Sequence, residues 1–479
     1  MVVSKVRQLT YFNLTAQEII NMDKRTFLKT SSLLIGGAVL SPFQGCNSDT
    51  SGKPVSEEGN EPLKNWAGNV QYSTGRVHYP KTVEEVQAVV KNCDQLKALG
   101  SRHSFNRIAD SDRNQVSLKE MNKVVSLDKK ANTITVEGGA RYGEFAGYLY
   151  KNGYALPNLA SLPHITVAGA CATATHGSGV KNGNLSTAVS AIEFVNAAGE
   201  VITISKQKDG EAFYGAVVSL GALGVVTKVT LDLLPAFDMK QVVYRNLPMQ
   251  ELRNHFDDIQ SKGYSVSLFT NWKDKNISEV WIKSRVEKGA ITPEDLELYG
   301  AKRATQNMHP VEDQSAENVT EQMGKPGPWY ERMPHFKMGF TPSTGKELQS
   351  EYFVPIEHAF DAMMAIEKLH DKISPYLFIS EIRTINADNF WMSPCYKKTC
   401  VALHTTWKQE VDTVMGLLPL MEAQLAPFNP IPHWAKLSTM SPTIRQSRFE
   451  KLYEFRQLVA RHDPDGKFRN EFLKKNLYQ

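Results

Sequence analysis

The chain has 479 residues, which is too many for a single hydrophobic core and suits two or three domains. Hydrophobic residues make up 41% and charged residues 22% of the sequence, as in ordinary soluble globular proteins. The net charge is only +4 and basic and acidic residues are interspersed, so a nucleic-acid-binding protein with a basic stripe is excluded.

The five cysteines carry little structural information. Their irregular spacing excludes both a disulfide scaffold and a zinc site. Cys395 and Cys400 could form a disulfide in an oxidising compartment, but we interpret them as unpaired thiols.

The N-terminal region predicts export. After Met22, a candidate for the true start, the basic pair Lys24-Arg25 precedes a short apolar run over 33–40 and then Gly45-Cys46. This order is typical of a secretory signal, and the run is too short for a permanent membrane span. The basic pair resembles a twin-arginine signal, and Gly45-Cys46 resembles a lipoprotein cleavage and acylation site. A plain secretory signal and an apolar segment that stays attached are the alternatives.

A strand-helix-strand unit opens the folded part. A capping box and apolar residues at helical spacing predict a helix over 82–96. The apolar run 96–99 predicts a strand that ends in the turn Gly100-Ser-Arg-His-Ser-Phe-Asn106. A glycine-led turn of this kind lets backbone N–H groups approach a phosphate, while His103 reaches a molecule bound nearby.

A run of small residues forms the second notable stretch. It follows a predicted strand over 133–136 and a predicted helix over 142–152 that ends at Gly153. Every residue from Ala168 to Gly179 is small except His176. A large flat ligand can lie directly on such a backbone. A close contact between a helix and its neighbour selects the same residues, so both interpretations stay open here.

A hairpin and a strand complete the first half. The hairpin is predicted over 188–196 and 200–204, and the strand follows Gly221-Ala-Leu-Gly and ends at Leu231. No GxGxxG motif opens a helix after the first strand, which disfavours a nicotinamide-binding Rossmann domain.

The second half is predicted to contain strands and long connections. Strands are predicted over 266–272 and 279–284, and most of 287–334 is predicted as extended surface connections. Two later strands, 378–385 and 401–407, carry polar residues on alternate positions. Alternate residues of a strand share one face.

The polar residues of the two later strands form pairs. Glu381 and Arg383 share one face of the first strand, and His404 and Thr406 share one face of the second. Polar pairs on neighbouring strands either meet solvent or line a polar cavity. The residues alone favour solvent.

Five motifs follow one another along the chain: Gly100-Ser-Arg-His-Ser-Phe-Asn106, Gly138-Gly-Ala-Arg-Tyr-Gly-Glu144, Ala160-Ser-Leu-Pro-His164, Thr173-Ala-Thr-His-Gly-Ser-Gly179 and Gly221-Ala-Leu-Gly-Val225. In this order they resemble the vanillyl-alcohol-oxidase type of FAD-binding domain, and within that family the bacterial alditol oxidases. The resemblance extends from Trp66 to the C-terminal Asp463-Pro-Asp-Gly-Lys-Phe-Arg-Asn470. It implies an α+β fold, with a two-subdomain FAD-binding domain and a substrate domain built on a large antiparallel sheet flanked by helices.

The resemblance also implies a division of the chain. We expect a signal and flexible tether over 1–64, an FAD-binding domain over 65–236, a substrate domain over 237–445, and a segment over 446–479 that returns to the FAD-binding domain.

The implied cofactor is FAD, bonded covalently through His103. Arg102 stands where relatives often carry glycine, so the turn is expected not to require a positive φ at this residue. Its guanidinium could add positive charge at the phosphates. Besides His103, the residues implied to bind FAD are Ala98, Leu99, Gly100, Ser101, Arg102, Ser104, Ser161, Thr166, Gly169, Thr173, Ala174, Thr175, His176, Val225 and His433.

The implied reaction is oxidation of the terminal hydroxyl of a sugar alcohol, such as xylitol or sorbitol, to the aldose. Hydride passes to flavin N5, and O₂ reoxidises the flavin to give H₂O₂. Arg383, Lys436 and His404 are the implied catalytic residues, and either of the last two could accept the hydroxyl proton. The residues implied to bind the polyol are Ser161, Glu381, Arg383, Thr406 and Lys436.

Two other functions stay open. One is an aldonolactone oxidase or dehydrogenase of the same fold, acting on gulono- or galactonolactone. The other is an exported lipoprotein that binds sugars without turnover. The expected partners are a small polyol and O₂, with no nucleic acid and no metal, and we expect a monomer in the bacterial periplasm or anchored to a membrane through Cys46.

Overall fold

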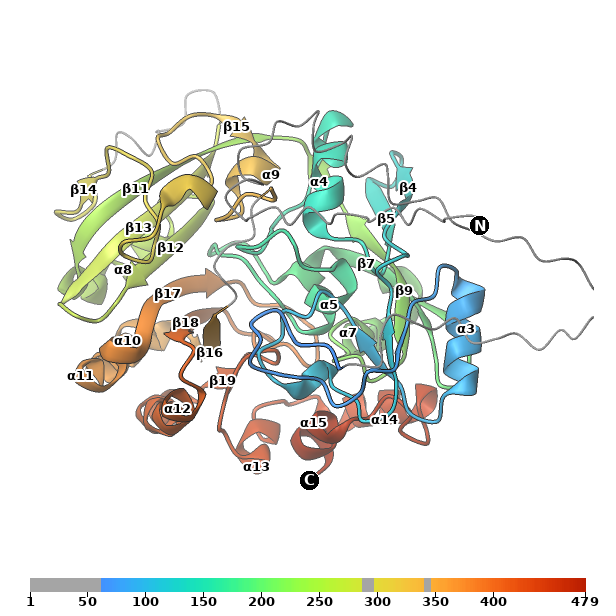
Figure 1. Cartoon of the computed structure of the whole chain (residues 1–479). Helices are drawn as coiled ribbons and strands as arrows, with labels where there is room; N and C mark the ends of the chain where they lie inside the picture. Colours follow the sequence, from blue (N-terminus) through green and yellow to red (C-terminus); the bar gives the residue numbers. More distant parts are fainter. Residues whose placement is uncertain (1–61, 287–296, 340–345) are drawn as a thin grey trace, which may run out of the picture. The chain divides into compact units, whose positions relative to one another are not determined.

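The computed structural model describes residues 62–286, 297–339 and 346–479 (Figure 1). These residues fall in one compact unit, residues 54–479, and the other unit, residues 1–53, lies outside the described residues. The predicted export signal and the acylation site at Cys46 therefore also lie outside them. Within the described ranges, the strands form four sheets of three, two, nine and five strands.

The first helix is shorter than expected. Helix α3, Val83–Asn92, begins after Thr82, whose side chain accepts a hydrogen bond from the Glu85 N–H. The predicted end at Leu96 is wrong, because Cys93 already has extended backbone and the Leu96 N–H donates to the carbonyl of Lys467. Apolar spacing continues past the helix because the following strand is also buried.

The other strands and helices predicted before residue 236 are confirmed to within one residue at their ends. Strand β2, Lys97–Leu99, pairs in parallel with β3, Gln115–Ser117, and leads directly into the turn that carries His103. Helix α4, Tyr142–Lys151, is followed by Gly153 with φ +84°. The five-stranded sheet consists of β4 Val124–Asp128, β5 Thr133–Glu137, β7 Val189–Val195, β8 Val201–Ser205 and β9 Val225–Asp232.

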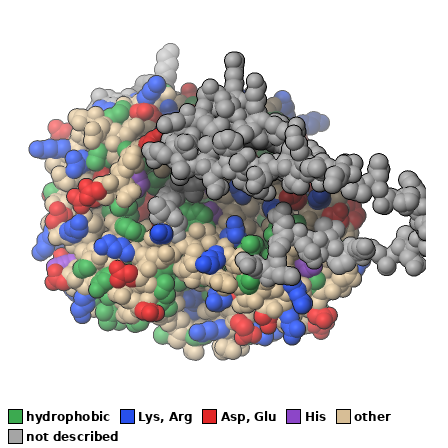
Figure 2. All heavy atoms as spheres, in the orientation of Figure 1, with side chains coloured by type: hydrophobic (Ala, Val, Ile, Leu, Met, Phe, Trp, Pro, Cys, Tyr) green, Lys and Arg blue, Asp and Glu red, His purple; other side chains and the backbone are tan. Residues whose placement is uncertain are grey.

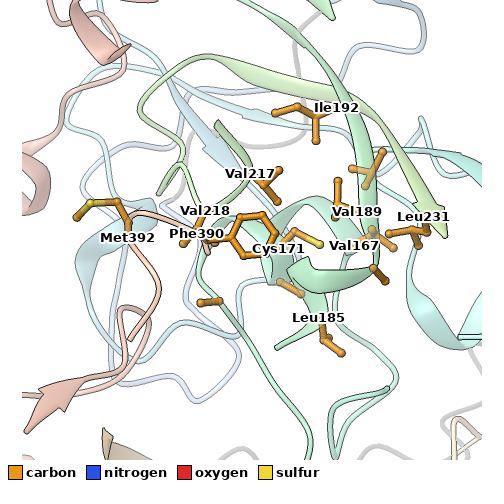
Figure 3. Packing of buried hydrophobic residues seen from close by; sticks show 14 of the residues in the cluster. Val167, Cys171, Leu185, Val189, Ile192, Val217, Val218, Leu231, Phe390 and Met392 are labelled. Carbon is orange, nitrogen blue, oxygen red and sulfur yellow. The ribbon is translucent and has the colours of Figure 1, made fainter. Parts of the chain in front are cut away.

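The small-residue run lies on helix α5, Val167–Ala172. Val167 and Cys171 pack into the hydrophobic core against strands β7 and β9 (Figure 3). Ala168 and Gly169, on the other side of the same short helix, line a large cavity. One side of α5 therefore packs closely, as the second interpretation expects, and the other side is open to the cavity, as the first one requires.

The second half is organised by the nine-stranded antiparallel sheet (Figure 1). Its order is β14-β11-β13-β12-β17-β18-β16-β19, with β15 paired to β11. The strands are β11 Asp238–Pro248, β12 Ser265–Thr270, β13 Asn276–Arg285, β14 Lys302–Arg303, β15 Gly327–Pro328, β16 Glu347–Pro355, β17 Leu377–Ile385, β18 Cys400–Lys408 and β19 Ile431–Pro432.

Helices cover one face of this sheet. Apolar residues of α8 Leu252–Gln260, α10 Ala359–Glu367 and α12 Val411–Leu425 form one core cluster with alternate residues of the strands, such as Ile382 and Leu403. The other alternate residues point to the opposite face, since neighbouring side chains of a strand diverge. That opposite face carries the polar pairs singled out in the sequence.

The expectation of surface connections over 287–334 is partly wrong. Residues 287–296 lie outside the described residues, and the rest contains short elements separated by extended chain. Val319 and Trp329 are completely buried, and Val319 packs with Phe269 and Trp281 on the helix-free face of the sheet. The polar composition of this segment concealed that it covers the sheet.

The C-terminal segment packs against the first half of the chain. Helix α14, Leu452–His462, contacts α7, Glu211–Val217, and Phe455 lies in the same core cluster as Phe213. The domain boundaries at 236 and 445 stay a prediction.

Among the described residues, no helix is long and apolar enough to cross a membrane. The face shown in Figure 2 has basic and acidic side chains interspersed.

Candidate active site

A cavity of about 740 Å³ lies between the His103 turn, helix α5 and the helix-free face of the large sheet. Ligand cavities typically measure about 300–1,000 Å³. The structure brings every predicted site residue except Ala174 to the lining of this one cavity. Ala174 does not line the cavity, and its side chain is buried in the hydrophobic core.

The wall formed by residues 98–104 and 166–176, here called the cofactor wall, brings backbone and small side chains to the cavity, and its turn packs tightly against Thr166. A Cβ atom at Gly100 would lie 2.7 Å from Thr166 Oγ1, and one at Gly169 would lie 2.9 Å from the same oxygen. The Thr173 hydroxyl donates to the carbonyl of Gly169. Small residues and hydroxyl groups in this arrangement suit a diphosphate and a flat ring system.

His103 lies at the centre of the cofactor wall. Its ring centroid is 5.0 Å from that of Trp66. Burial, followed by the positive charges of His164 and Arg141, lowers the pKa of His103 to about 4. The imidazole is therefore neutral at physiological pH and keeps a lone pair on one ring nitrogen.

The expectation for Arg102 is wrong. Its φ is +65°, in the left-handed region that favours glycine. The guanidinium donates to the carbonyl of Lys64 at 3.1 Å, and the Arg102 carbonyl accepts from the Trp66 N–H at 2.8 Å. These two bonds to residues before the turn hold the strained backbone, so the guanidinium is engaged there.

The opposite wall of the cavity, here called the substrate wall, consists of β16, β17 and β18 with Lys436. Strand pairing places Glu381 opposite His404, and His404 opposite Glu351 of β16. Glu381 and Arg383 are each 6% exposed, and Glu351 is completely buried. The polar pairs therefore line a cavity, and the solvent interpretation is wrong.

Glu351 is the central anion of the substrate wall. Arg383 Nη2 donates to its Oε1 at 2.6 Å, His176 Nε2 lies 3.2 Å from the same oxygen, and Lys436 Nζ lies 3.5 Å from Oε2. Burial opposes ionisation, but the charges of Lys436, His176 and Arg383 outweigh it and hold the pKa of Glu351 well below its ordinary value. Glu351 is therefore a carboxylate surrounded by positive groups.

Lys436 connects the catalytic residues predicted from the sequence. Its Nζ donates to Gln349 Oε1 at 2.6 Å and lies 3.0 Å from His404 Nδ1. An ammonium group can only donate, so His404 Nδ1 accepts, and the ring proton is on Nε2, 3.1 Å from Thr406 Oγ1. Burial and the nearby Lys436 charge lower the pKa of His404 to about 4. His404 is neutral.

The substrate wall also contains residues that the sequence interpretation missed. Glu351 and Gln349 alternate along β16 just as Glu381 and Arg383 alternate along β17, so the same two-residue spacing could have identified them. His335, whose Nε2 is 2.7 Å from Glu381 Oε1, follows a segment without periodicity, and no signal in the sequence marked it.

His176, Glu351 and His433 place ligand atoms within 4.8 Å of one another, close enough to hold a metal ion. Arg383 and Lys436 already neutralise the Glu351 carboxylate. The geometry therefore favours an ion-pair network at this point over a metal site.

Ser161 lines the cavity, and its carbonyl accepts from the His335 N–H.

Two family models match the parts of the chain that form the cofactor wall and the substrate wall. The model of the FAD binding domain family matches residues 75–205, and that of D-arabinono-1,4-lactone oxidase matches residues 339–476. An alditol oxidase from Streptomyces sp. is 44% identical over 415 residues, which cover 86% of this chain and 98% of the relative. An L-gulono-1,4-lactone dehydrogenase from Mycobacterium tuberculosis is 26% identical, with 86% of this chain and 98% of the relative covered.

Two solved structures have the same fold. Cholesterol oxidase from B. sterolicum aligns with a TM-score of 0.71 and 13% identity, covering 87% of this chain and 96% of the other. Carbohydrate oxidase from Microdochium nivale, solved with a substrate analogue, aligns with a TM-score of 0.67 and 16% identity, covering 84% and 92%. The expected α+β fold of the vanillyl-alcohol-oxidase type is confirmed.

Proposed function

Because the chain belongs to the alditol oxidase family of FAD-dependent enzymes, we propose that it oxidises the terminal hydroxyl group of an open-chain sugar alcohol to an aldehyde. One observation carries this proposal. Arg383 Nε and Glu351 Oε2 are buried in the substrate wall and make no hydrogen bond within 62–286, 297–339 and 346–479. Each has an ion-pair neighbour slightly beyond hydrogen-bond range or at its limit: Glu381 Oε2 is 3.6 Å from Arg383 Nε, and Lys436 Nζ is 3.5 Å from Glu351 Oε2. A hydroxyl group both donates and accepts, so a polyol can satisfy a guanidinium donor and a carboxylate acceptor together.

The cofactor wall suits FAD, because the backbone and small residues of the turn and of α5, Gly100 and Gly169 among them, line the cavity. When bound, FAD accepts a hydride from the carbinol carbon and passes the electrons to O₂, so that one alcohol and one O₂ give one aldehyde and one H₂O₂. Thr166 and Thr173 would hold its phosphates.

The substrate wall orients the alcohol and stabilises charge. Glu381, a carboxylate, accepts a hydrogen bond from a hydroxyl of the chain. Arg383 and Lys436 place positive charge where the hydroxyl oxygen becomes negative as its proton leaves. These groups are buried, so water weakens their interactions little.

Lys436 and His404 remove the proton together. The one ring lone pair of neutral His404 is on Nδ1, which already accepts from Lys436. Lys436 therefore passes its own proton to Nδ1 as it receives the hydroxyl proton, and it remains an ammonium group. Glu351 Oε2, 3.8 Å from His404 Nδ1, offsets the charge of the imidazolium that forms.

Product analysis tests the proposed reaction. Purified protein supplied with xylitol or sorbitol in air is expected to form aldose and H₂O₂ in equal amounts. Faster turnover of gulono- or galactonolactone would replace the proposal with a lactone oxidase. Turnover only with an artificial electron acceptor would identify a dehydrogenase.

We also propose a covalent bond between His103 and FAD. The neutral imidazole in the cofactor wall supports it, because the bond requires a ring nitrogen with a free lone pair. Acid precipitation is expected to leave yellow flavin in the wild-type pellet and in the supernatant of His103→Ala. Flavin in the wild-type supernatant would exclude the bond.

Export is a further part of the proposal, supported by the order of residues from Lys24 to Cys46. Fractionation of the native bacterium is expected to place the protein in the periplasm or membrane. Cys46→Ala should abolish labelling with a radioactive fatty acid. A cytoplasmic protein without label would contradict export and acylation.

A further inference from the structure

A buried lysine lies behind Glu381, outside the residues assigned above. Lys283, on strand β13, is 1% exposed. Its Nζ reaches three acceptors: the carbonyl of Met333, the carbonyl of Pro334 at 3.1 Å and His335 Nδ1 at 2.9 Å. An ammonium group has three N–H donors and no acceptor, so three acceptors match it completely.

These contacts determine where the proton of His335 lies. Because Lys283 donates to Nδ1, the ring proton of neutral His335 must be on Nε2. Nε2 is 2.7 Å from Glu381 Oε1 and donates to it. Lys283, His335 and Glu381 thus form a chain of hydrogen bonds with one direction, from the core toward the cavity.

The direction matters for Glu381. With its proton on Nδ1, His335 would turn a lone pair toward a carboxylate oxygen, and the two would repel. With the proton on Nε2, one oxygen of Glu381 is fixed, and the other lies 3.6 Å from Arg383 Nε. Burial opposes ionisation of Glu381, but Arg383 and His335 outweigh it and hold its pKa well below the ordinary value.

We propose that Lys283 and His335 are positioning residues that fix Glu381 as an ionised hydrogen-bond acceptor for a substrate hydroxyl. This inference rests on the proposed function, since it concerns the same site. Neither residue is assigned a contact with substrate, and both act through Glu381. The proposal explains why the structure buries a lysine on a sheet face next to the cavity.

The alternative is that Lys283 only attaches the segment around Pro334 to the sheet. The variant His335→Phe separates the two roles. The phenyl ring can keep the packing of His335 against Trp281 and Phe269, whose ring centroids lie 4.9 and 5.7 Å away, while both hydrogen bonds are lost. His335→Gln should restore a donor toward Glu381.

Steady-state kinetics with xylitol provide the first test. A hydrogen bond to a charged group contributes about 1.5–3 kcal/mol, which corresponds to a roughly 10- to 100-fold rise in KM for His335→Phe and Lys283→Met, with a smaller change in kcat. His335→Gln is expected within about fivefold of wild type. Flavin content and thermal unfolding show whether each variant folds.

Glu279→Gln is the matched control. Glu279 lies on the same strand and face as Lys283 and is also buried, but it bonds Trp281 Nε1. The proposal would be overturned if His335→Phe and Lys283→Met fold but raise KM by no more than Glu279→Gln does. Failure of wild-type protein to oxidise any polyol would instead overturn the proposed function.

Nitrogen NMR of ¹⁵N-histidine-labelled protein provides a test independent of turnover. The signal missing from His335→Phe identifies His335. We expect an unprotonated Nδ1 and a protonated Nε2 in wild type, and a change of this pattern in Lys283→Met. A protonated Nδ1 in wild type would overturn the proposal.

The pH profile gives a readout that a purely structural role would not produce. Burial lowers the pKa of Lys283 to about 7. A neutral amine has only two N–H groups and a lone pair, so the direction of the chain is no longer imposed. KM for xylitol is expected to rise as pH increases through about 7 in wild type, and to stay flat there in Lys283→Met; a rise of equal size in both would overturn the proposal.

Discussion

The cofactor wall and the substrate wall face the same cavity but are built in opposite ways. The cofactor wall presents backbone and small side chains, and Gly100 and Gly169 line the cavity while packing tightly against Thr166. The substrate wall presents buried charges that pair with one another, with Glu351 and Arg383 at its centre. A large rigid group can be held by shape, whereas a flexible chain of hydroxyl groups must be held by hydrogen bonds. The cofactor wall should therefore tolerate little added volume, and the substrate wall little loss of charge.

The largest effect is expected from removing a charge. Lys436→Met deletes the ammonium group that contacts Gln349 and His404. We expect kcat with xylitol to fall about 100- to 1,000-fold, as for loss of a donor that stabilises developing negative charge. Lys408→Met, on the same strand as His404 but exposed, is the control and should keep wild-type rates. Equal rates in both variants would contradict the role of the substrate wall.

Adding volume to the cofactor wall tests the other half of the comparison. Gly100→Val would place its Cβ 2.7 Å from Thr166 Oγ1. We expect the molar ratio of bound FAD to protein, measured by absorbance after purification, to fall by roughly tenfold, because the turn and Thr166 are forced apart in the wall that would hold FAD. Gly416→Val is the control, since a Cβ there meets no atom within 4 Å. Full FAD occupancy in Gly100→Val would show that this turn does not approach the cofactor closely.

The charges of the substrate wall should also make stability depend on pH. The folded-state pKa of Glu351 lies below its ordinary value of 4.5, so the unfolded chain binds a proton more readily. The stabilising contribution is present above about pH 4.5 and is lost as pH falls toward the folded-state pKa. Tm of Glu351→Gln should therefore fall less steeply than that of wild type between about pH 5 and 3. Parallel curves would mean that Glu351 gains no net stabilisation from its neighbours.

The smallest effect is expected at the rim of the cofactor wall. Arg102→Gly relieves the strain of a left-handed non-glycine residue, which stabilises the fold by about 1 kcal/mol. It also removes the exposed hydrogen bond to the Lys64 carbonyl, which destabilises the fold by about 0.5–1 kcal/mol. The two nearly cancel, so we expect Tm to change by less than about 2 °C. Asn132→Gly, at φ +52°, is the comparison for the backbone effect alone. A fall above about 5 °C in Arg102→Gly would show that the guanidinium holds the turn.

The two walls also differ in how far they could be predicted. The cofactor wall was identifiable because its residues are consecutive in the chain, in the turn over 100–106 and the run over 168–179. The sequence did not indicate that Ala174 lies in the core and not in the cavity lining, because a run of small residues does not show which side chains face the core. The φ of Arg102 was also predicted wrongly, because a tight turn can impose a strained backbone on a large residue when other bonds hold it.

The substrate wall was only half predicted. The two-residue spacing identified Glu381 and Arg383 as sharing a face, but the spacing alone favoured solvent. The same spacing on β16 passed unnoticed, and with it Glu351. The role of Lys283 could not have been predicted, because its hydrogen-bond partners at residues 333–335 lie about 50 residues away in the sequence.

By itself, the sequence determined what depends on neighbours along the chain: the turn around His103, the small residues of α5, the hairpin of β7 and β8 and the alternation of β17. The tertiary structure alone decided which face of the large sheet is covered by helices and which faces the cavity. It also decided that Lys283, His335 and Glu381, separated by about a hundred residues, form one chain of hydrogen bonds. The physical reason is that burial and pairing of charges depend on strand order, and strand order brings together residues that are distant in sequence.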